Sequence, residues 1–166
     1  TDIRHFSNLL GVKSKVPVRS PLSISASHLS WTKTGDASFK GDIAVKEGPH
    51  ISLGFFRRTD RLKVQKLRIN DGPSQADMTF ELQGKTLGVT FSGELSERTL
   101  DKIFEGYQFQ DGWARGDFRV NIDLDQPLQS MAQGKIKAHD LTFPSKLKKP
   151  LEISDISLDD QKNRVS

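Results

Sequence analysis

The chain has 166 residues, of which 34% are hydrophobic, and its 25 Lys and Arg against 21 Asp and Glu give a formal net charge of +4. This length fits one domain with a substantial core, and the regular return of apolar residues excludes a disordered protein. The absence of cysteine excludes disulfides, cysteine-ligated metal sites and thiol nucleophiles, and the interspersed charges do not favour a polyanionic partner.

The chain opens with a segment, 1–16, whose apolar residues recur at helical spacing. We expect a helix or linker there, followed by a single domain over 17–166. No apolar run approaches the ~20 residues that span a bilayer, and the first residues form neither a signal peptide nor an initiator Met. The sequence therefore indicates a soluble piece of a longer protein, and we expect any membrane anchor to lie outside this piece.

Most of the domain alternates apolar and polar residues with period two, which is typical of strands with one dry and one wet face. Short connections that contain glycine or proline separate neighbouring strands, so antiparallel pairing is expected. We count about nine strands. The clearest alternating segments are 21–27, 38–47, 50–56, 76–84, 85–95 and 114–124.

One helix is predicted inside the domain at 96–105. Ser96 suits its N-cap, Leu95 and Leu100 suit the hydrophobic staple, and Gly106 can end it. This helix is ~15 Å long, whereas nine strands make a sheet ~43 Å wide. It is too small to cover the apolar face of the sheet, so that face must pack on a second sheet, close into a barrel or remain an open groove.

Four segments share a template in which the alternation changes parity once: 24–31, 62–69, 136–143 and 151–158. A β-bulge at the change of parity would keep both halves of a strand facing one side and would bend the strand. The alternative is two short strands joined by a kink at the corner of a sandwich. We expect bulges at Ser27-His28, Gln65-Lys66, His139-Asp140 and Ser154-Asp155. The predicted fold is mainly β, a curled antiparallel sheet with an open groove and one or two short helices.

The C-terminal half resembles the AsmA-like family of Gram-negative bacteria (the AsmA/TamB/YhdP group). The resemblance covers roughly residues 74–160 and includes "SGELSERTLDKIF" at 92–104. Its repeat ends in the pattern formed here by Gly134, Ile136, Ala138, Leu141, Phe143 and Pro144. Members resemble the bridge-like lipid transfer proteins, so the resemblance implies a periplasmic β-sheet groove, an inner-membrane anchor outside this chain and a part in phospholipid transport and outer-membrane biogenesis.

Hydrocarbon is a suitable ligand for such a groove, because each methylene removed from water contributes ~0.8 kcal/mol and an acyl chain of about 16 carbons gains on the order of 10 kcal/mol. We therefore predict a phospholipid or other acyl-chain lipid as partner and no catalysis. The alternative is a closed β-sandwich that serves as a scaffold or protein-binding module. The residues predicted to line the groove are Phe39, Ile43, Val45, Met78, Phe80, Val89, Phe91, Phe118, Val120, Ile122, Ile136 and Phe143.

Motifs for other chemistry are missing from the sequence, which contains no phosphate-binding loop and no nucleophile elbow. The aspartates match no calcium loop, and Trp31 and Trp113 are expected in the core. We therefore predict no cofactor and no metal site. The histidines, expected at surface or bulge positions rather than as ligands, are His5, His28, His50 and His139.

Three basic clusters are assigned first to solvated loops, second to contacts with lipid head groups, and only third to nucleic acid, because no stacking aromatics accompany them. Nucleic acid is therefore not expected as a partner. The clusters are Lys13-Lys15-Arg19, Arg57-Arg58-Arg61 and Lys146-Lys148-Lys149.

Overall fold

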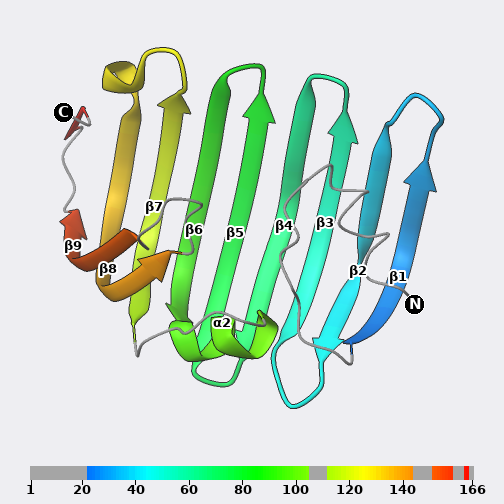
Figure 1. The fold of residues 1–166 in the computed structure, drawn as a ribbon, viewed down its shortest axis with the longest axis horizontal. Coiled ribbons are helices and arrows are strands. Elements are labelled where there is room, and N and C mark those ends of the chain that lie inside the picture. The colour runs from blue at the N-terminus through cyan, green and yellow to red at the C-terminus, as the bar shows by residue number, and fades with distance from the viewer. Residues whose placement is uncertain (1–21, 105–111, 144–150, 159–162, 165–166) are drawn as a thin grey trace.

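The computed structural model describes residues 22–104, 112–143, 151–158 and 163–164, and the side chains of 22–126 and 128–140 within them. The predicted helix or linker at 1–16, two of the basic clusters and Gly106 lie outside these ranges. The described part is one antiparallel sheet of ten strands with one short helix (Figure 1).

Eight strands run as a simple meander, each paired with its neighbour in sequence, and β9 and β10 both pair with the outer edge of β8. The predicted fold class is confirmed, and nine strands was close to the ten observed. The described strands form one open sheet, not two sealed layers. The strands are β1 (Leu22–Trp31), β2 (Ala37–Val45), β3 (His50–Arg58), β4 (Arg61–Asp71), β5 (Ser74–Gln83), β6 (Thr86–Ser96), β7 (Trp113–Asp123), β8 (Met131–Phe143), β9 (Leu151–Leu158) and β10 (Asn163–Arg164).

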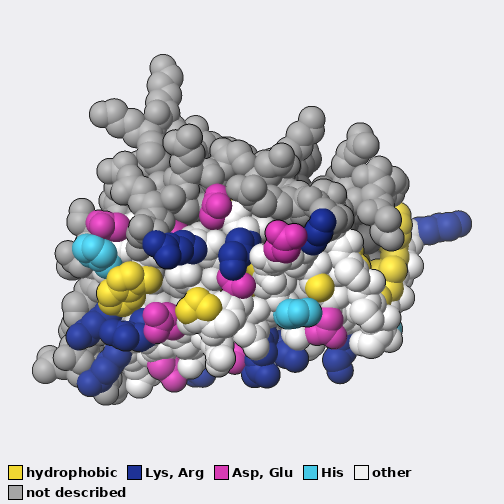
Figure 2. Space-filling model, turned by 90° about the horizontal axis from the view of Figure 1, so that it is seen from below, with side chains coloured by type: hydrophobic (Ala, Val, Ile, Leu, Met, Phe, Trp, Pro, Cys, Tyr) yellow, Lys and Arg dark blue, Asp and Glu magenta, His cyan; other side chains and the backbone are white. Residues whose placement is uncertain are grey.

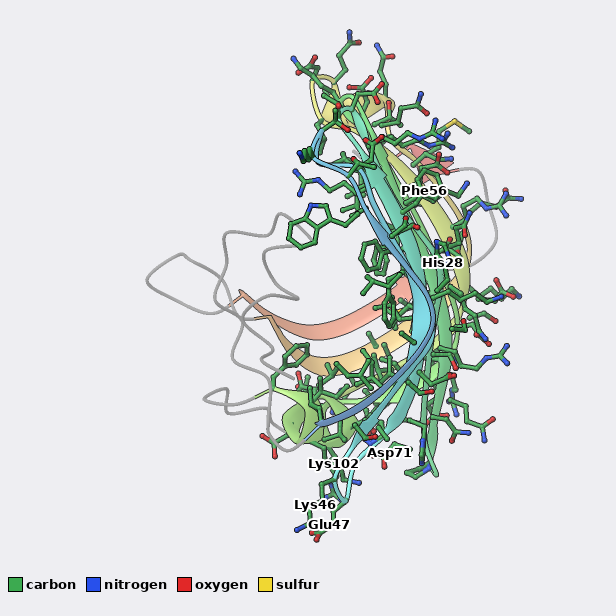
Figure 3. All side chains as sticks on the ribbon, turned by 90° about the vertical axis from the view of Figure 1, so that its right-hand side faces the viewer. His28, Lys46, Glu47, Phe56, Asp71 and Lys102 are labelled. Carbon is green, nitrogen blue, oxygen red and sulfur yellow. The ribbon has the colours of Figure 1, made fainter. Side chains whose placement is uncertain are left out.

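The sheet is strongly curved, so that it has a concave and a convex face (Figure 3). Two of the four predicted bulges produce a register shift. Ser27 is the extra residue of β1, because Ala26 pairs with Gly41 and His28 already pairs with Lys40. In β4 the register relative to β5 shifts between Val64 and Leu67. Val64 pairs with Phe80 and Leu67 with Met78, so two residues of β4, Gln65 and Lys66, lie opposite one residue of β5. Each bulge keeps the apolar residues before and after it on the same face.

The other two predicted bulges face each other and produce no shift. His139 pairs with Asp155 and Leu141 pairs with Ile153, so the register between β8 and β9 is the same on both sides of the irregularity. The backbone of Asp140 has a positive φ of 47°, which marks the step in β8. The irregularities predicted at these two places therefore leave the register between β8 and β9 unchanged, because an extra residue in each of two facing strands restores the pairing.

Glycines at the bend complete the curvature. Gly93 of β6 pairs with Ala76 on one side and Gly116 on the other, and its φ is +117°. A Cβ at Gly93 would overlap the carbonyl oxygen of Gln75 in the neighbouring strand. Glycine inside a strand is typical of such tight bends and close backbone approaches.

Helix α2 (Glu97–Ile103) lies across the concave face at the end of the sheet where β4 meets β5 (Figure 1). Ser96 is its N-cap as predicted, with its side chain accepting from the backbone N–H of Thr99, and Phe104 is its C-cap. The predicted bounds 96–105 were too long by one residue at the start and two at the end. A short 3₁₀ turn, η1 (Pro127–Gln129), connects β7 to β8.

A polar network fixes α2 to the β4–β5 turn. The hydroxyl of Thr99 lies 2.7 Å from Ser74 Oγ and 3.0 Å from Asp71 Oδ2, and the Lys102 ammonium lies 2.9 Å from the same Asp71 oxygen. The backbone N–H of Ser96 donates to Ser74 Oγ at 3.0 Å. Thr99 and Ser74 are each only 1% exposed, so the hydrogen bond between them is shielded from water and holds the helix in one position.

Candidate functional site

The concave face is apolar from β1 to β8. Because side chains alternate along a strand, residues paired directly across the sheet share a face, and the pairing carries one apolar row from Ile43 through Ile51 and Ile69 to Ala76. A second row runs from Phe80 through Val89 to Val120.

The predicted groove residues fall together on this face. By register, eleven of the twelve lie on it, and the twelfth, Phe143, is paired with Leu151 at the end of β8, where side chains are not described. The parity assigned from sequence was therefore correct in every strand that can be checked. The eleven are Phe39, Ile43, Val45, Met78, Phe80, Val89, Phe91, Phe118, Val120, Ile122 and Ile136.

The end of the concave face beneath α2 forms a core. Val45, Ile51 and Ile69 are buried there against Ile103 of the helix. Ile43 and Met78 from the predicted set pack on this cluster and are partly buried. These residues therefore stabilise the fold, and their role as a binding surface is limited by the helix that covers them.

Aromatic side chains dominate the middle of the face. Phe39 and Phe55, each 3% exposed, form a buried cluster with Ala37, and their ring centroids lie 6.0 Å apart. Phe91 is also buried, and its ring stacks on that of Phe118 at 5.5 Å. Each pair consists of direct partners in neighbouring strands, and ring pairs at these distances are stabilising.

Other apolar side chains of β5 to β7 are only half-buried, among them Phe80, Val89, Phe118, Val120 and Ile122. Among the described residues, α2 is the only helix that packs on the concave face, and it lies at the other end of these strands. The structure thus leaves a strip of partly exposed hydrocarbon along three neighbouring strands.

The end of the sheet opposite α2 exposes large apolar side chains. On the concave side of β1, Leu29 is 60% exposed and Trp31 is 70% exposed. The expectation that Trp31 lies in the core was wrong, because it is the last residue of an edge strand and has a neighbouring strand on one side only among the described residues. The β7–β8 connection adds Leu124 and Leu128, which are also exposed.

The convex face carries the polar residues. Arg68 pairs with Asp77 at 2.7 Å, and Glu81 pairs with Lys63 and Arg61. Hydrogen bonds from Lys63 and then from Arg61 hold the pKa of Glu81 below its ordinary value of 4.5. Figure 2 shows acidic and basic side chains mixed over the end of the sheet, with hydrophobic side chains only in small groups among them. This pattern is typical of a solvated surface.

Two of the described histidines and two of the aspartates make local polar contacts. His28 Nε2 lies 2.9 Å from Ser38 Oγ, and His139 Nε2 lies 3.0 Å from Asp140 Oδ2. Asp123 Oδ1 accepts hydrogen bonds from the backbone N–H groups of Asp125 and Gln126 and so shapes the turn after β7. Within the described ranges, no three potential ligands lie close enough together to hold a metal ion.

Arg57 is the concave-face residue that sequence reasoning missed. It pairs with Ala37 and Leu62, in the same transverse row as Trp31. The alternation along the strand could have placed Arg57 on this face, because Arg57 has the same parity as Ile51, Leu53 and Phe55. From the sequence, Arg57 was instead assigned to a basic cluster in a solvated loop. Arg61 of that cluster lies instead on the convex side, with its guanidinium 5.5 Å from the centre of the Phe56 ring.

No protein-family model, curated protein or solved structure matches this chain. None of the helices in the described residues has the length and hydropathy that a membrane span requires.

Proposed function

We propose that the concave face binds the acyl chains of a lipid and that the protein acts without catalysis. The observation that carries this proposal is the half-buried strip of β5 to β7, from Phe80 and Val89 to Val120, on a face that carries apolar side chains in every strand from β1 to β8. Apolar surface left in partial contact with water is stabilised by a hydrocarbon ligand, and a Val, Leu, Ile and Phe lining needs no directional contacts to hold one.

The resemblance to AsmA-like proteins extends the proposal. It adds a phospholipid as the lipid, a place in the periplasm with an inner-membrane anchor outside this chain, and a part in phospholipid transport toward the outer membrane. The curved single sheet with an apolar interior agrees with that assignment. Lipid that co-purifies with the chain from a Gram-negative periplasm can be identified by mass, so one experiment tests both the lipid and the location.

The test uses native mass spectrometry of the purified chain and titration with a fluorescent fatty acid. Val120→Glu places a carboxylate in the half-buried strip, whereas Asn121→Glu makes the same charge change at the next residue, which is exposed on the convex face. We expect the first variant to lose at least about tenfold in fatty-acid affinity, because a charge desolvated by the ligand is costly, and the second to bind as the parent does.

A third variant, Val120→Thr, keeps the side-chain volume and guards against a simple loss of folding. It should retain the far-ultraviolet circular dichroism of a β-protein and bind the fatty acid more weakly than the parent. A folded parent protein that carries no lipid and binds no fatty acid would refute the proposal, as would equal binding by the Val120 and Asn121 variants.

A further inference from the structure

The end of the sheet opposite α2 carries the most exposed hydrocarbon among the described residues. This rim holds the β1–β2, β3–β4, β5–β6 and β7–β8 connections (Figure 1). Every exposed large hydrophobic side chain of the described ranges lies at or beside it, and their exposure runs from 52% to 73%: Leu29, Trp31, Leu124, Leu128 and Met131. Such an accumulation at one end of a protein is typical of an interaction surface.

A single transverse row of residues connects the exposed side chains of β1 with those that follow β7. Successive direct pairs lead from Trp31 across β2 to β6 and end at Ile122. Residues paired in this way share a face, which here is the concave one. We call this set the rim row, and its residues are Trp31, Ala37, Arg57, Leu62, Leu82, Leu87 and Ile122.

The rim row is apolar except for Arg57, and only Ala37 within it is buried. At β7 the strand pairing continues past the row, because the backbone N–H of Leu124 donates to the carbonyl oxygen of Lys85 at 2.9 Å. Leu124 therefore has the parity of Ile122. Exposure rises toward the rim, from the half-buried Val120 and Ile122 to the exposed Leu124 and Leu128.

The dimensions of the rim row favour a flat and extended partner. Six strand spacings of ~4.8 Å make the row about 29 Å long, and two residues along a strand make it about 7 Å wide, so it covers roughly 200 Å². A stable protein–protein interface buries about 800 Å² on each partner. A lipid bilayer does not require that area, because acyl chains surround each apolar side chain that passes the head groups.

The charges at the rim favour contact with hydrocarbon over attraction to anionic lipid. The β1–β2 connection, 32–36, holds Lys33 and Asp36, whose charges cancel. The charged residue of the β7–β8 connection, 124–130, is Asp125, which pairs with Lys85 at 2.7 Å. Arg57 has a long aliphatic stem and a charged end, which suit the boundary between hydrocarbon and head groups, as does a tryptophan.

We propose that the rim row and the exposed side chains beside it dock this protein on the surface of a lipid bilayer, with Trp31, Leu124 and Leu128 inserted below the head groups. The proposal goes beyond the binding of acyl chains on the concave face and does not depend on it. The sheet then has a membrane contact of its own, and its concave face opens toward the bilayer at the end that α2 leaves uncovered.

The two tryptophans report on opposite ends of the sheet. Trp31 ends the rim row, whereas Trp113 pairs with Ser96, the N-cap of α2. Trp113→Phe leaves Trp31 as the sole tryptophan, and Trp31→Phe leaves Trp113. With vesicles of phosphatidylcholine brominated on its acyl chains, the emission of Trp31 should be quenched and that of Trp113 should be unchanged.

Flotation with unbrominated phosphatidylcholine vesicles separates protein on a bilayer from protein that has drawn single lipids into solution. The parent should float at low and at high salt, because contact with hydrocarbon is not screened. Trp31→Ser/Leu128→Ser should lower the vesicle partition coefficient at least about tenfold, since it removes two large apolar contacts. The matched control, Gln75→Ser/Lys137→Ser, shortens two exposed side chains of the convex face and should float as the parent does.

A parent that does not float, equal flotation of the two double variants, or equal quenching of the two tryptophans would overturn the docking proposal. Quenching of Trp31 in protein that stays in solution with lipid would also overturn it, while supporting the binding of acyl chains. Flotation by a parent that binds no fatty acid would support docking and refute the acyl-chain proposal. A dimer that Trp31→Ser dissociates, measured by light scattering without vesicles, would assign the rim to a second copy of the chain and overturn docking on a bilayer.

Discussion

Replacing Gly93 with alanine tests whether glycines set the curvature of the sheet. The backbone of Gly93 has a φ of +117°, which L-residues rarely adopt, and an added Cβ would overlap the carbonyl oxygen of Gln75 and lie 3.1 Å from the Cα of Ala76. Backbone strain of this kind costs about 1–3 kcal/mol, and forced overlap in a packed region costs about as much again. We therefore expect Gly93→Ala to lower the free energy of unfolding by about 3–5 kcal/mol.

The matched control is Gly88→Ala in the same strand. The nearest atom to a Cβ at Gly88 is Oδ1 of Asn121 at 3.2 Å, the end of a movable side chain, and the nearest backbone atom is 3.8 Å away. Thermal unfolding followed by far-ultraviolet circular dichroism should show a midpoint roughly 10 °C lower for Gly93→Ala and one within a few degrees of the parent for Gly88→Ala. Equal midpoints for the two variants would refute the role of Gly93 in the bend.

Two further predictions concern α2 and the convex face. Thr99→Val removes a hydrogen-bonding partner of Asp71 and Ser74 in a buried site, so it should lower the free energy of unfolding measured in urea by about 1–3 kcal/mol. Thr86→Val, at an exposed strand position, should leave that free energy nearly unchanged. No effect of Thr99→Val would contradict the proposed anchoring of α2 by this network. The pKa of Glu81 is lowered in the folded protein, so its contribution to stability is present above pH 4.5 and is lost as the pH falls through that lowered pKa. The difference in unfolding midpoint between the parent and Glu81→Gln should therefore shrink below pH 4.5. A difference that grows in acid would contradict the role of Glu81 in these ion pairs.

The strand pattern and the parity of the groove residues could be predicted from the sequence because alternation is a local property. Phe118, Val120 and Ile122 alternate with charged or polar residues, and this alone fixes which side chains share a face. The bulge in β1 at Ser27 was equally local, since the change of parity within one segment predicts it.

Features that depend on pairing between distant residues could not be found in the same way. Thr99 and Glu97 lie at the start of a short helix and are polar, so the sequence places them in water. Thr99 is buried because Ser74 of the β4–β5 turn packs against the helix, and Glu97 is buried where its carboxylate accepts from the backbone N–H of Gly112. The cancelled register shift between β8 and β9 likewise depends on where Ser154 lies opposite Asp140. Arg57 was recognised as basic, but only the pairing with Ala37 shows that it shares a row with Trp31.

Curvature connects the stability of this sheet to its proposed ligand. The strands bend toward the concave face (Figure 3), and on that face the direct cross-strand pairs Phe39–Phe55 and Phe91–Phe118 shield one another from water. Beyond these pairs, Val89 and Val120 remain half-buried, and an acyl chain can take up the contacts that no further side chain supplies. It follows that a variant that opens the bend should weaken the fold and the hydrocarbon site together, whereas Val120→Thr should weaken the hydrocarbon site far more than the bend.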